Sequence, residues 1–305
     1  MDHTPVMLAE VLDSLSPKEG GIYVDGTFGA GGYTRAILDA APCTVVAIDR
    51  DSNVQSAADE MKSQYGDRFI FVRGAFGDVE ALLQGAGIEK IDGFVLDIGV
   101  SSMQLDQAER GFSFRYDAPL DMRMDQEGEK TAADIVNDTE EEALANLIYT
   151  YGEERHSRRI AKNIVKSRTD GPIKTTGQLA EIVKASYPGY SKTDPATKTF
   201  QALRIAVNDE LGQLQSALSA APRVLKSGGC LSVVTFHSLE DRIVKAFMVE
   251  QSGQSPKGSR YMPEVSATVQ ALFDLPSKKP VKPSAAEIES NPRARSARLR
   301  MAVRL

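Results

Sequence analysis

In the first third of the chain, short and nearly continuous apolar runs alternate with amphipathic stretches. The runs lie at Ile22–Val24, Val45–Ile48, Phe69–Val72 and Phe94–Ile98. Uninterrupted hydrophobicity of this length is typical of parallel strands that are covered on both faces. The segment Tyr33 to Leu38, after the first run, is an amphipathic helix candidate. This alternation predicts an α/β fold with a doubly wound sheet, whose ligands bind at the carboxyl ends of the strands.

The alternation stops after Ser101-Ser102. From about residue 105 to about residue 207 no segment has a convincing strand pattern, and the apolar spacing instead predicts helices at Thr139–Tyr149, Arg155–Arg168 and Thr176–Ala185. A longer helix is expected over Thr197–Leu218. We therefore expect a helical domain, residues 105–210, inserted into a core formed by residues 1–104 and 211–305.

Strand signals return in the last third of the chain. Leu225–Gly229 is expected to be a helix end and turn, and Leu231–Phe236 a fifth parallel strand, followed by a helix from about residue 239 to residue 249. Thr268–Leu275 and Arg298–Leu305 are two further strand candidates. At the other end of the chain, Thr4-Pro5 is typical of a helix start, before an apolar stripe at Leu8, Val11, Leu12 and Leu15. The sum is a seven-stranded sheet.

Composition narrows the class of protein. The chain has 305 residues, of which 42% are hydrophobic and 26% charged, which is ordinary for a globular protein. No apolar run approaches the roughly 20 residues that span a bilayer, and the first residues lack the pattern of a secretion signal. Cys43 and Cys230 are far apart and have no metal-ligand spacing, so we expect two small buried hydrophobic residues, no metal site and a cytoplasmic protein.

The charge is unevenly distributed. A net charge of -6 argues against a protein that simply coats nucleic acid. However, Asp121–Glu142 is strongly acidic, whereas Asn291–Leu305 carries five arginines and no acid. The simpler interpretation of these runs is a solvated charged surface, but a local basic patch can hold phosphates even on an acidic protein.

Candidate chemistry begins at the glycine-rich turn Asp25–Gly32, which directly follows the first strand. Glycines allow the backbone to approach a ligand closely. Asp49 follows the second strand, where a carboxylate can accept both hydroxyls of a ribose. Asp97 ends the fourth strand, so three acids are expected at one edge of the sheet. Together they predict a ligand that carries a nucleoside.

Two nucleoside cofactors fit this pattern. A nicotinamide-binding fold also has glycines after the first strand and an acid after the second. Asp25, however, lies in the turn itself, where a carboxylate would repel a pyrophosphate but not a cationic ligand. This favours S-adenosylmethionine.

Several motifs resemble the RsmH (MraW) family, and they occur in family order from His3 to the C-terminus. They include Asp25–Gly32, Ala47–Asp51, Leu96–Ser102, Gln104–Asp106, Glu109–Phe114, Pro119–Met124, Tyr151–Arg155, Thr199–Arg204, Phe236–Arg242 and Asn291–Ser296. The resemblance implies a Rossmann-like seven-stranded methyltransferase sheet and S-adenosylmethionine as cofactor. It also implies methylation of N4 of one cytidine in the decoding region of 16S rRNA, in the small ribosomal subunit.

The resemblance also implies cofactor-binding residues, which cluster in the first turn and at the later strand ends: Asp25, Gly29, Gly31, Gly32, Tyr33, Asp49, Phe76, Asp97 and Gln104. Asp49 would lie at the ribose and Phe76 beside the adenine. Two positions depart from the family pattern, with Tyr33 in place of a histidine and Met103 in place of a proline. The residues alone, without the resemblance, favour a core aromatic for Phe76 and a surface loop residue for Gln104.

Methylation of a cytosine amine requires alignment, because the N4 lone pair is conjugated into the ring. A hydrogen-bond acceptor on N4 would localise that pair and later take the proton. The segment Asp97–Val100 lacks the Pro-Pro motif that many amino-methyltransferases use here. Asp97 or a nearby backbone carbonyl is the first catalytic candidate, and His237 is the second. His237 is alternatively a structural hydrogen-bonding group, and Glu240, Asp241 and Arg242 a helix-start cap with ion pairs.

RNA would be held by basic and aromatic side chains. The basic candidates are Arg155, Arg159, Lys162 and Lys166 on one helical stripe, with Arg293, Arg295 and Arg298 near the C-terminus. The target base would have to leave its stack, and Phe112, Phe114 or Tyr116 could stack on it. These aromatics are equally plausible as core anchors of the insertion.

Two other functions remain open on the sequence. One is a methyltransferase that acts on DNA cytosine or adenine, against which the missing Pro-Pro motif argues. The other is an RNA-binding or assembly protein that binds S-adenosylmethionine without turnover. The sequence does not distinguish naked RNA from an assembled subunit as substrate, and it leaves a homodimer open.

Overall fold

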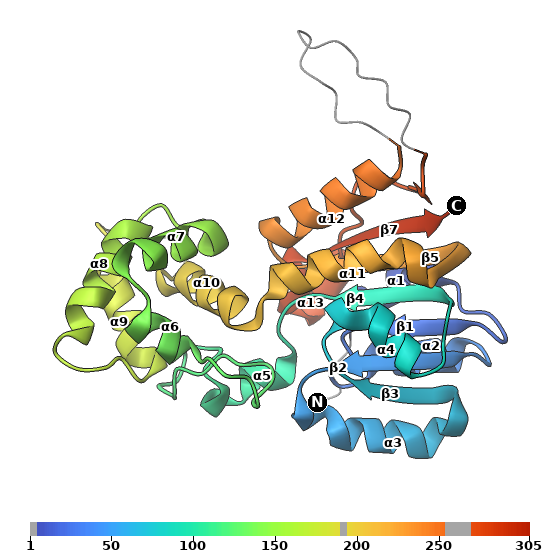
Figure 1. Cartoon of the computed structure of the whole chain (residues 1–305), viewed down its shortest axis with the longest axis horizontal. Coiled ribbons are helices and arrows are strands. Elements are labelled where there is room, and N and C mark those ends of the chain that lie inside the picture. Colours follow the sequence, from blue (N-terminus) through green and yellow to red (C-terminus); the bar gives the residue numbers. More distant parts are fainter. Residues whose placement is uncertain (1–4, 190–193, 254–269) are drawn as a thin grey trace, which may run out of the picture. The chain divides into compact units, whose positions relative to one another are not determined.

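The computed structural model describes residues 5–189, 194–253 and 270–305 (Figure 1). The chain divides into two compact units, of which one comprises residues 1–99 and 211–305 and the other residues 100–210. The sequence-based division placed these boundaries after residues 104 and 210. Thr4 and the first two residues of the strand candidate Thr268–Leu275 lie outside the described residues.

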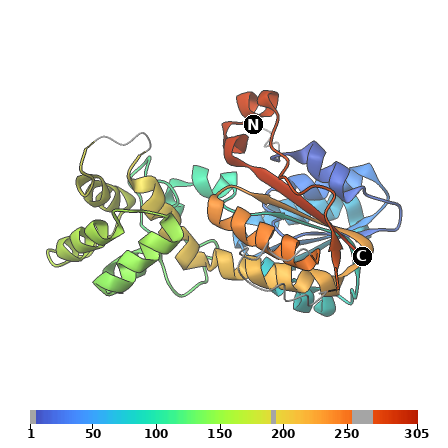
Figure 2. The same ribbon diagram turned by 90° about the horizontal axis from the view of Figure 1, so that it is seen from above.

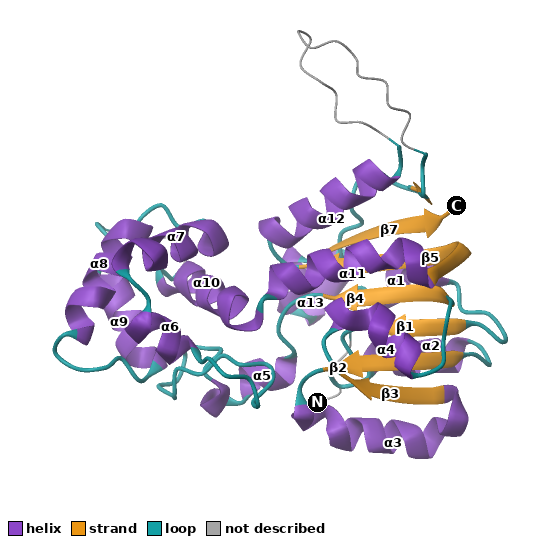
Figure 3. Ribbon diagram, viewed as in Figure 1, coloured by secondary structure: helices purple, strands orange, loops and turns teal. Residues whose placement is uncertain are grey.

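The first unit contains the predicted seven-stranded sheet (Figure 3), with the strand order β3-β2-β1-β4-β5-β7-β6. Strands β3, β2, β1, β4 and β5 run parallel to one another, whereas β7 is antiparallel to both β5 and β6. The strands span Ile22–Asp25 (β1), Thr44–Asp49 (β2), Phe69–Arg73 (β3), Ile91–Asp97 (β4), Leu225–Thr235 (β5), Phe273–Asp274 (β6) and Arg298–Arg304 (β7). The prediction of a doubly wound α/β sheet is confirmed.

Helices cover both faces of this sheet because its central strands are apolar on both sides. On one face, α4, α11 and α12 pack against β-strand residues such as Val46, Phe94 and Val233. Helices α1 and α2 lie on the opposite face, as Figure 2 shows. The helices of this unit span Leu8–Leu15 (α1), Gly32–Ala40 (α2), Gln55–Tyr65 (α3), Val79–Gly85 (α4), Glu210–Val224 (α11), Ser238–Gln251 (α12) and Ala285–Ser290 (α13). Cys43 and Cys230 are buried and unbridged, as predicted.

The prediction of a single helix over Thr197–Leu218 is wrong. The structure has two helices, α10 (Ala196–Asn208) and α11, separated by Asp209 in the left-handed region at φ 47°. Aspartate tolerates this region better than most residues because its short polar side chain can bond locally. The apolar stripe continues across the break, so its periodicity hides the change of direction.

Two predicted boundaries also change. Leu225–Gly229 is not a simple turn, because Leu225 already pairs with Ile91 and the following residues form an irregular register before Cys230 pairs with Gly93. The first helix begins at Leu8 rather than at Pro5, and Met7 precedes it in a left-handed conformation. In the described part of the chain, no helix has the length and apolar character needed to cross a membrane.

The second unit is helical and has its own core. Its helices span Ser102–Asp106 (α5), Ala132–Asp138 (α6), Glu141–Gly152 (α7), Ser157–Arg168 (α8), Thr176–Ala185 (α9) and Ala196–Asn208 (α10). The core is formed by apolar residues of these helices, such as Leu144, Ile160 and Leu203, which are fully buried. The predicted insertion therefore stabilises itself by burying the apolar face of each helix.

Buried polar groups fix the long loop that precedes α6. Arg110 donates to the carbonyl oxygens of Arg123 and Met124 at 3.0 Å. Asn208 donates to the carbonyl of Met122 and accepts from the amide of Met124, both at 2.8 Å. Such buried bonds are costly to break, because the remaining partner is left without water.

Gly111 is the tightest point of this loop. Its φ is 71°, and a Cβ there would lie 2.3 Å from the Pro119 carbonyl oxygen and 2.7 Å from the Asp121 amide nitrogen. We predict that Gly111→Ala lowers the free energy of unfolding by more than about 2 kcal/mol, because both contacts are with backbone. Urea denaturation of the full-length protein measures this.

Gly87→Ala is the matched control. Gly87 has a φ of 73°, and no atom lies within 4 Å of the position that a Cβ would take. Alanine at this position therefore meets no clash and lowers the free energy of unfolding only through the unfavourable positive φ, by about 1 kcal/mol. Equal losses in the two variants would contradict the argument from the clash.

Candidate functional site

Three acidic side chains meet at one edge of the sheet. Asp25 ends β1, Asp49 ends β2 and Asp97 ends β4. These strands are neighbours in the order β2-β1-β4 and run parallel. The expected placement of the acids at carboxyl strand ends is confirmed, and such an edge is where α/β proteins bind ligands.

Asp25 is buried and organises the turn that follows it. One carboxylate oxygen accepts the Thr27 amide at 3.1 Å, and the other accepts the Thr34 hydroxyl at 2.8 Å. Burial raises the pKa of Asp25 to about 6 against these two hydrogen bonds, which lower it. Both oxygens therefore have structural partners, and the residue connects β1 to the start of α2.

Asp49 fixes the middle of the same turn. Its two oxygens accept the amide of Gly29 at 2.8 Å and the amide of Asp51 at 2.9 Å. Burial raises the pKa of Asp49, and the two backbone amides partly offset this. Each carboxylate oxygen has a second lone pair, so both oxygens can still accept a hydroxyl from a ligand.

The glycines of the turn are required by packing. Gly29 and Gly31 have positive φ angles of 52° and 77°. A Cβ on Gly31 would lie 2.6 Å from the Met61 methyl group, and one on Gly32 would lie 2.2 Å from the Pro5 ring. The backbone at the start of α2 is therefore packed too closely against neighbouring side chains to carry a Cβ at these two positions.

The side chain of Tyr33 is buried and hydrogen-bonded within the protein. Its hydroxyl donates a hydrogen bond to the Val6 carbonyl oxygen. Burial, together with the nearby Asp97 and Asp25 charges, raises the pKa of its phenol well above the usual value. The tyrosine that replaces the family histidine therefore anchors the N-terminal segment.

Asp97 differs from the other two acids. Its Oδ1 is buried and has no hydrogen-bond partner in the described residues, while its backbone amide donates to the Thr27 hydroxyl at 2.8 Å. Burial, and after it the charges of Asp25 and Glu240, raise the pKa of this carboxyl to about 8. An unpaired buried oxygen of this kind calls for a cation or an N–H donor.

Phe76 and Gln104 also have structural roles. Phe76 is half-buried in the short helix Phe76–Asp78, packs against the sheet core, and lies beside the first turn, because a Cβ on Gly26 would be 3.2 Å from its own. Gln104 is buried in the second unit, where it accepts the Ser101 amide at 3.0 Å and so caps α5. The expectation that Gln104 is a surface loop residue is thus wrong.

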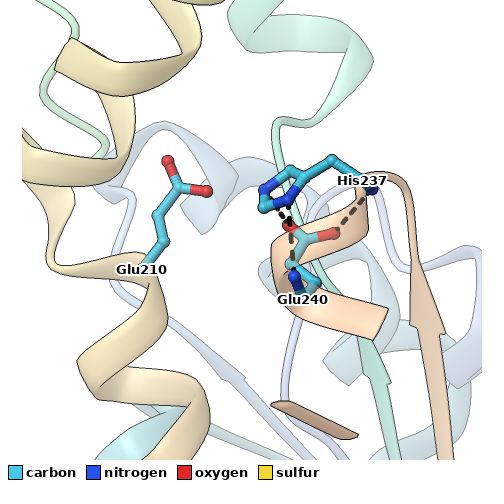
Figure 4. Close-up of side chains that lie close together, drawn as sticks. All are labelled: Glu210, His237 and Glu240. Carbon is cyan, nitrogen blue, oxygen red and sulfur yellow. Dashed lines mark hydrogen bonds and ion pairs between the residues drawn. The ribbon is translucent and has the colours of Figure 1, made fainter. Parts of the chain in front are cut away.

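His237 starts α12 together with Glu240 (Figure 4). The Nδ1 atom of His237 accepts the Glu240 amide at 3.4 Å, and its Nε2 atom lies 2.9 Å from Oε1 of the Glu240 carboxylate. The other carboxylate oxygen of Glu240 accepts the amides of Phe236 and His237 at 2.8 and 3.1 Å. The structural interpretation of His237 and the predicted helix cap are confirmed.

Asp241 joins α12 to β7. It bonds to Arg300 at 2.7 Å and to Arg298 at 2.9 Å. Burial would raise the pKa of Asp241, but the two arginines lower it. Arg298 is therefore partly neutralised, whereas Arg293 and Arg295 extend from the exposed short helix Pro292–Ser296.

In the second unit, the basic stripe lies mostly on α8. Arg159, Lys162 and Lys166 are exposed, while Ile160 and Ile164 are fully buried on the other side. Arg155 is exposed as well, but it lies in the turn before α8, which begins two residues later than expected, at Ser157. The predicted amphipathic helix is confirmed.

The three aromatic candidates of the insertion differ in exposure. Phe112 is buried beneath the Arg110 guanidinium, and Phe114 packs edge-on against Phe200 with ring centroids 4.8 Å apart. Tyr116 is 71% exposed. Phe112 and Phe114 are thus anchors of the core.

Sequence reasoning did not identify Thr27, which receives the Asp97 amide, or the electrostatic role of Glu240, which is fully buried. A threonine two residues after the strand-end acid was the available signal for Thr27. Nothing in the sequence indicated Glu240, because its approach to Asp97 depends on how β5 and β4 pair.

The comparisons with known proteins identify the family. The family model described as the MraW methylase family matches residues 1–305. A protein named Ribosomal RNA small subunit methyltransferase H from Paramagnetospirillum magneticum is 54% identical over 304 residues, which cover 99% of this chain and 95% of that protein. A protein of the same name from Methylobacterium sp. (strain 4-46) is 56% identical over 303 residues, 98% of this chain and 89% of that protein.

The hydrogen-bond acceptors at this edge of the sheet suit the cofactor of a methyltransferase family. Asp49 has free lone pairs for a ribose, and Asp97 has an unpaired oxygen for a cationic or N–H-bearing group. The chain belongs to the MraW methylase family, and it is a methyltransferase that uses S-adenosylmethionine.

Proposed function

We propose that this enzyme transfers a methyl group from S-adenosylmethionine to N4 of one cytidine in the decoding region of 16S rRNA. The names of the relatives support ribosomal RNA of the small subunit as the substrate. The observation that carries the assignment to an amino group is the unpaired buried oxygen of Asp97 at the end of β4. It is an acceptor that an exocyclic amine can satisfy.

The residues of the first unit suit the cofactor. Asp49 would accept the ribose hydroxyls, and Phe76 would lie beside the adenine. The first backbone amides of α2, which as in any helix have no partner within the helix itself, would hold a carboxylate, as helix N-termini do. When bound, S-adenosylmethionine supplies an electrophilic methyl group on a sulfonium centre.

Asp97 would orient the nucleophile. An acceptor bonded to one N4 hydrogen draws the amine lone pair out of conjugation with the ring and then takes the proton. A carboxyl with a pKa near 8 is matched to that task close to neutral pH. His237 is the second candidate, but it would first have to leave Glu240.

The RNA would be held mainly through its phosphates. The exposed cations Arg155, Arg159, Lys162 and Lys166 and the C-terminal Arg293, Arg295 and Arg298 would grip the backbone. Of the three aromatic candidates in the insertion, Tyr116 is the most exposed and would stack on an extruded base. We infer that the enzyme acts in the cytoplasm on small ribosomal subunits.

The direct test is methyl transfer to small subunits from a strain that lacks the gene. The purified protein should introduce one labelled methyl group per subunit, and digestion of the rRNA should yield N4-methylcytidine by mass spectrometry. Binding of S-adenosylmethionine without any transfer would instead indicate an RNA-binding or assembly protein. A methyl group on another base would refute the choice of N4.

Asp97→Asn should change both stability and turnover. Because the folded-state pKa is about 8 and the usual value is 3.8, the folded protein keeps a proton that the unfolded chain loses between about pH 4 and pH 8. The free energy of unfolding then falls as pH rises, by up to about 1.4 kcal/mol per pH unit for this group. Asn removes this contribution, and turnover should fall about a hundredfold or more.

Urea denaturation between pH 6 and pH 8 and single-turnover kinetics measure the two effects. Asp13→Asn, an exposed acid on α1, is the control and should keep the pH slope and the turnover of the wild type. Unchanged turnover of Asp97→Asn with unchanged affinity for S-adenosylmethionine would exclude the catalytic role.

Arg159→Gln should weaken RNA binding and reduce its salt dependence. Each phosphate contact that is lost lowers the slope of log K against log salt by about 1. Filter binding of small-subunit rRNA at several salt concentrations measures the slope. Lys18→Gln removes an exposed charge near the amino ends of the strands and should leave it unchanged. An equal slope in both variants would contradict the role of α8.

A further inference from the structure

A second pocket lies beside the carboxyl end of β5 and is formed wholly by the first unit. It has a volume of about 270 Å³ and lies between the start of α12, the segment that leads into α13, and the start of β7. Its lining residues are Phe236 and His237, which connect β5 to α12, Ser238 at the start of α12, and, from the C-terminal segment, Lys282, Pro283, Ile288 and the residues 295–298.

The pocket is positively charged. Lys282, Arg295 and Arg298 line it, and the residues that line it include no acid. Asp241 lies nearby, but it is shared between Arg298 and the buried Arg300, so its single negative charge does not balance them. In a chain with a net charge of -6, this is a local excess that favours a phosphate.

The pocket also has apolar lining residues. Phe236, Pro283, Ile288 and Ala297 lie beside the cations. An inorganic phosphate ion makes no favourable contact with apolar side chains. A nucleotide, in contrast, places its base against apolar and aromatic groups and its phosphate against cations. Charge and apolar surface within 270 Å³ therefore match a whole nucleotide.

The pocket adjoins the proposed methyl-transfer site. Asp97 pairs with Val234 in the sheet, two residues before Phe236. A Cβ on Gly99, just after Asp97, would lie 3.7 Å from the Phe236 ring. Phe236, which lines the pocket, therefore lies close to the backbone just after Asp97, and this places the pocket next to the proposed methyl-transfer site.

We propose that this pocket holds the nucleotide adjacent to the target cytidine, with its phosphate bound by Arg295 and Lys282. The inference rests on the proposed function and extends it, because it assigns a second nucleotide subsite. Holding the neighbouring nucleotide stabilises the extruded conformation of the target, whose unstacking costs a few kcal/mol.

The first test uses steady-state methylation of small ribosomal subunits by Lys282→Gln and Arg295→Gln. Each variant should raise KM for the subunit about tenfold, as expected for one lost charge-assisted contact, with kcat and the affinity for S-adenosylmethionine within twofold of the wild type. Lys18→Gln is the matched control and should change none of these. A KM equal to that of Lys18→Gln in both variants would overturn the proposal.

The second test measures binding without turnover. Cytidine 5′-monophosphate, cytidine and inorganic phosphate are titrated into the full-length protein by calorimetry. The monophosphate should bind most tightly, lose about tenfold in affinity in Arg295→Gln, and compete with subunits in the methylation assay. Equal binding of inorganic phosphate, or inhibition that subunits do not relieve, would overturn the subsite, in the second case in favour of a site for a free nucleotide.

The two tests separate this inference from the proposed function. If the wild-type enzyme does not methylate cytosine N4, the proposed function fails whatever the calorimetry gives. If it does methylate N4 while the variants behave like Lys18→Gln, the subsite fails together with the phosphate contact assigned to Arg295, but the methylation of N4 stands.

Discussion

The arrangement of the first unit depends on the burial of negative charge at one edge of the sheet. Asp25 and Glu240 lie close enough to Asp97 that their charges raise the pKa of its carboxyl. Both oxygens of Asp25 and one oxygen of Glu240 accept hydrogen bonds from the protein, whereas Oδ1 of Asp97 and Oε1 of Glu240 have no hydrogen-bond partner among the described residues. A folded protein tolerates such an oxygen where a ligand completes it.

The surrounding structure serves to hold this edge. The glycine turn has no room for side chains, and Asp49 ties its backbone through the Gly29 amide. Tyr33 anchors the N-terminal segment from the first turn of α2. The departure from the family histidine at this position therefore has a structural explanation in a buried hydroxyl and a backbone carbonyl.

The helical unit is stabilised independently of the charges on its surface. It carries exposed cations on α8, yet its stability comes from a separate apolar core and from buried polar bonds such as those of Arg110 and Asn208. The exposed cations and the buried apolar side chains of α8 lie on opposite faces, so the charged face is not needed for the packing of this unit.

The sequence by itself determined the parallel strands, the acids at their ends and the helical insertion. These features depend on local periodicity and on the position of a residue relative to its own strand. The tertiary structure alone decided the break at Asp209, the capping role of Gln104 and the pairing of His237 with Glu240. It also brought Lys282 to Arg295 around one pocket. Such features arise between segments that are distant in the chain, where the local pattern carries no information about which side chains meet.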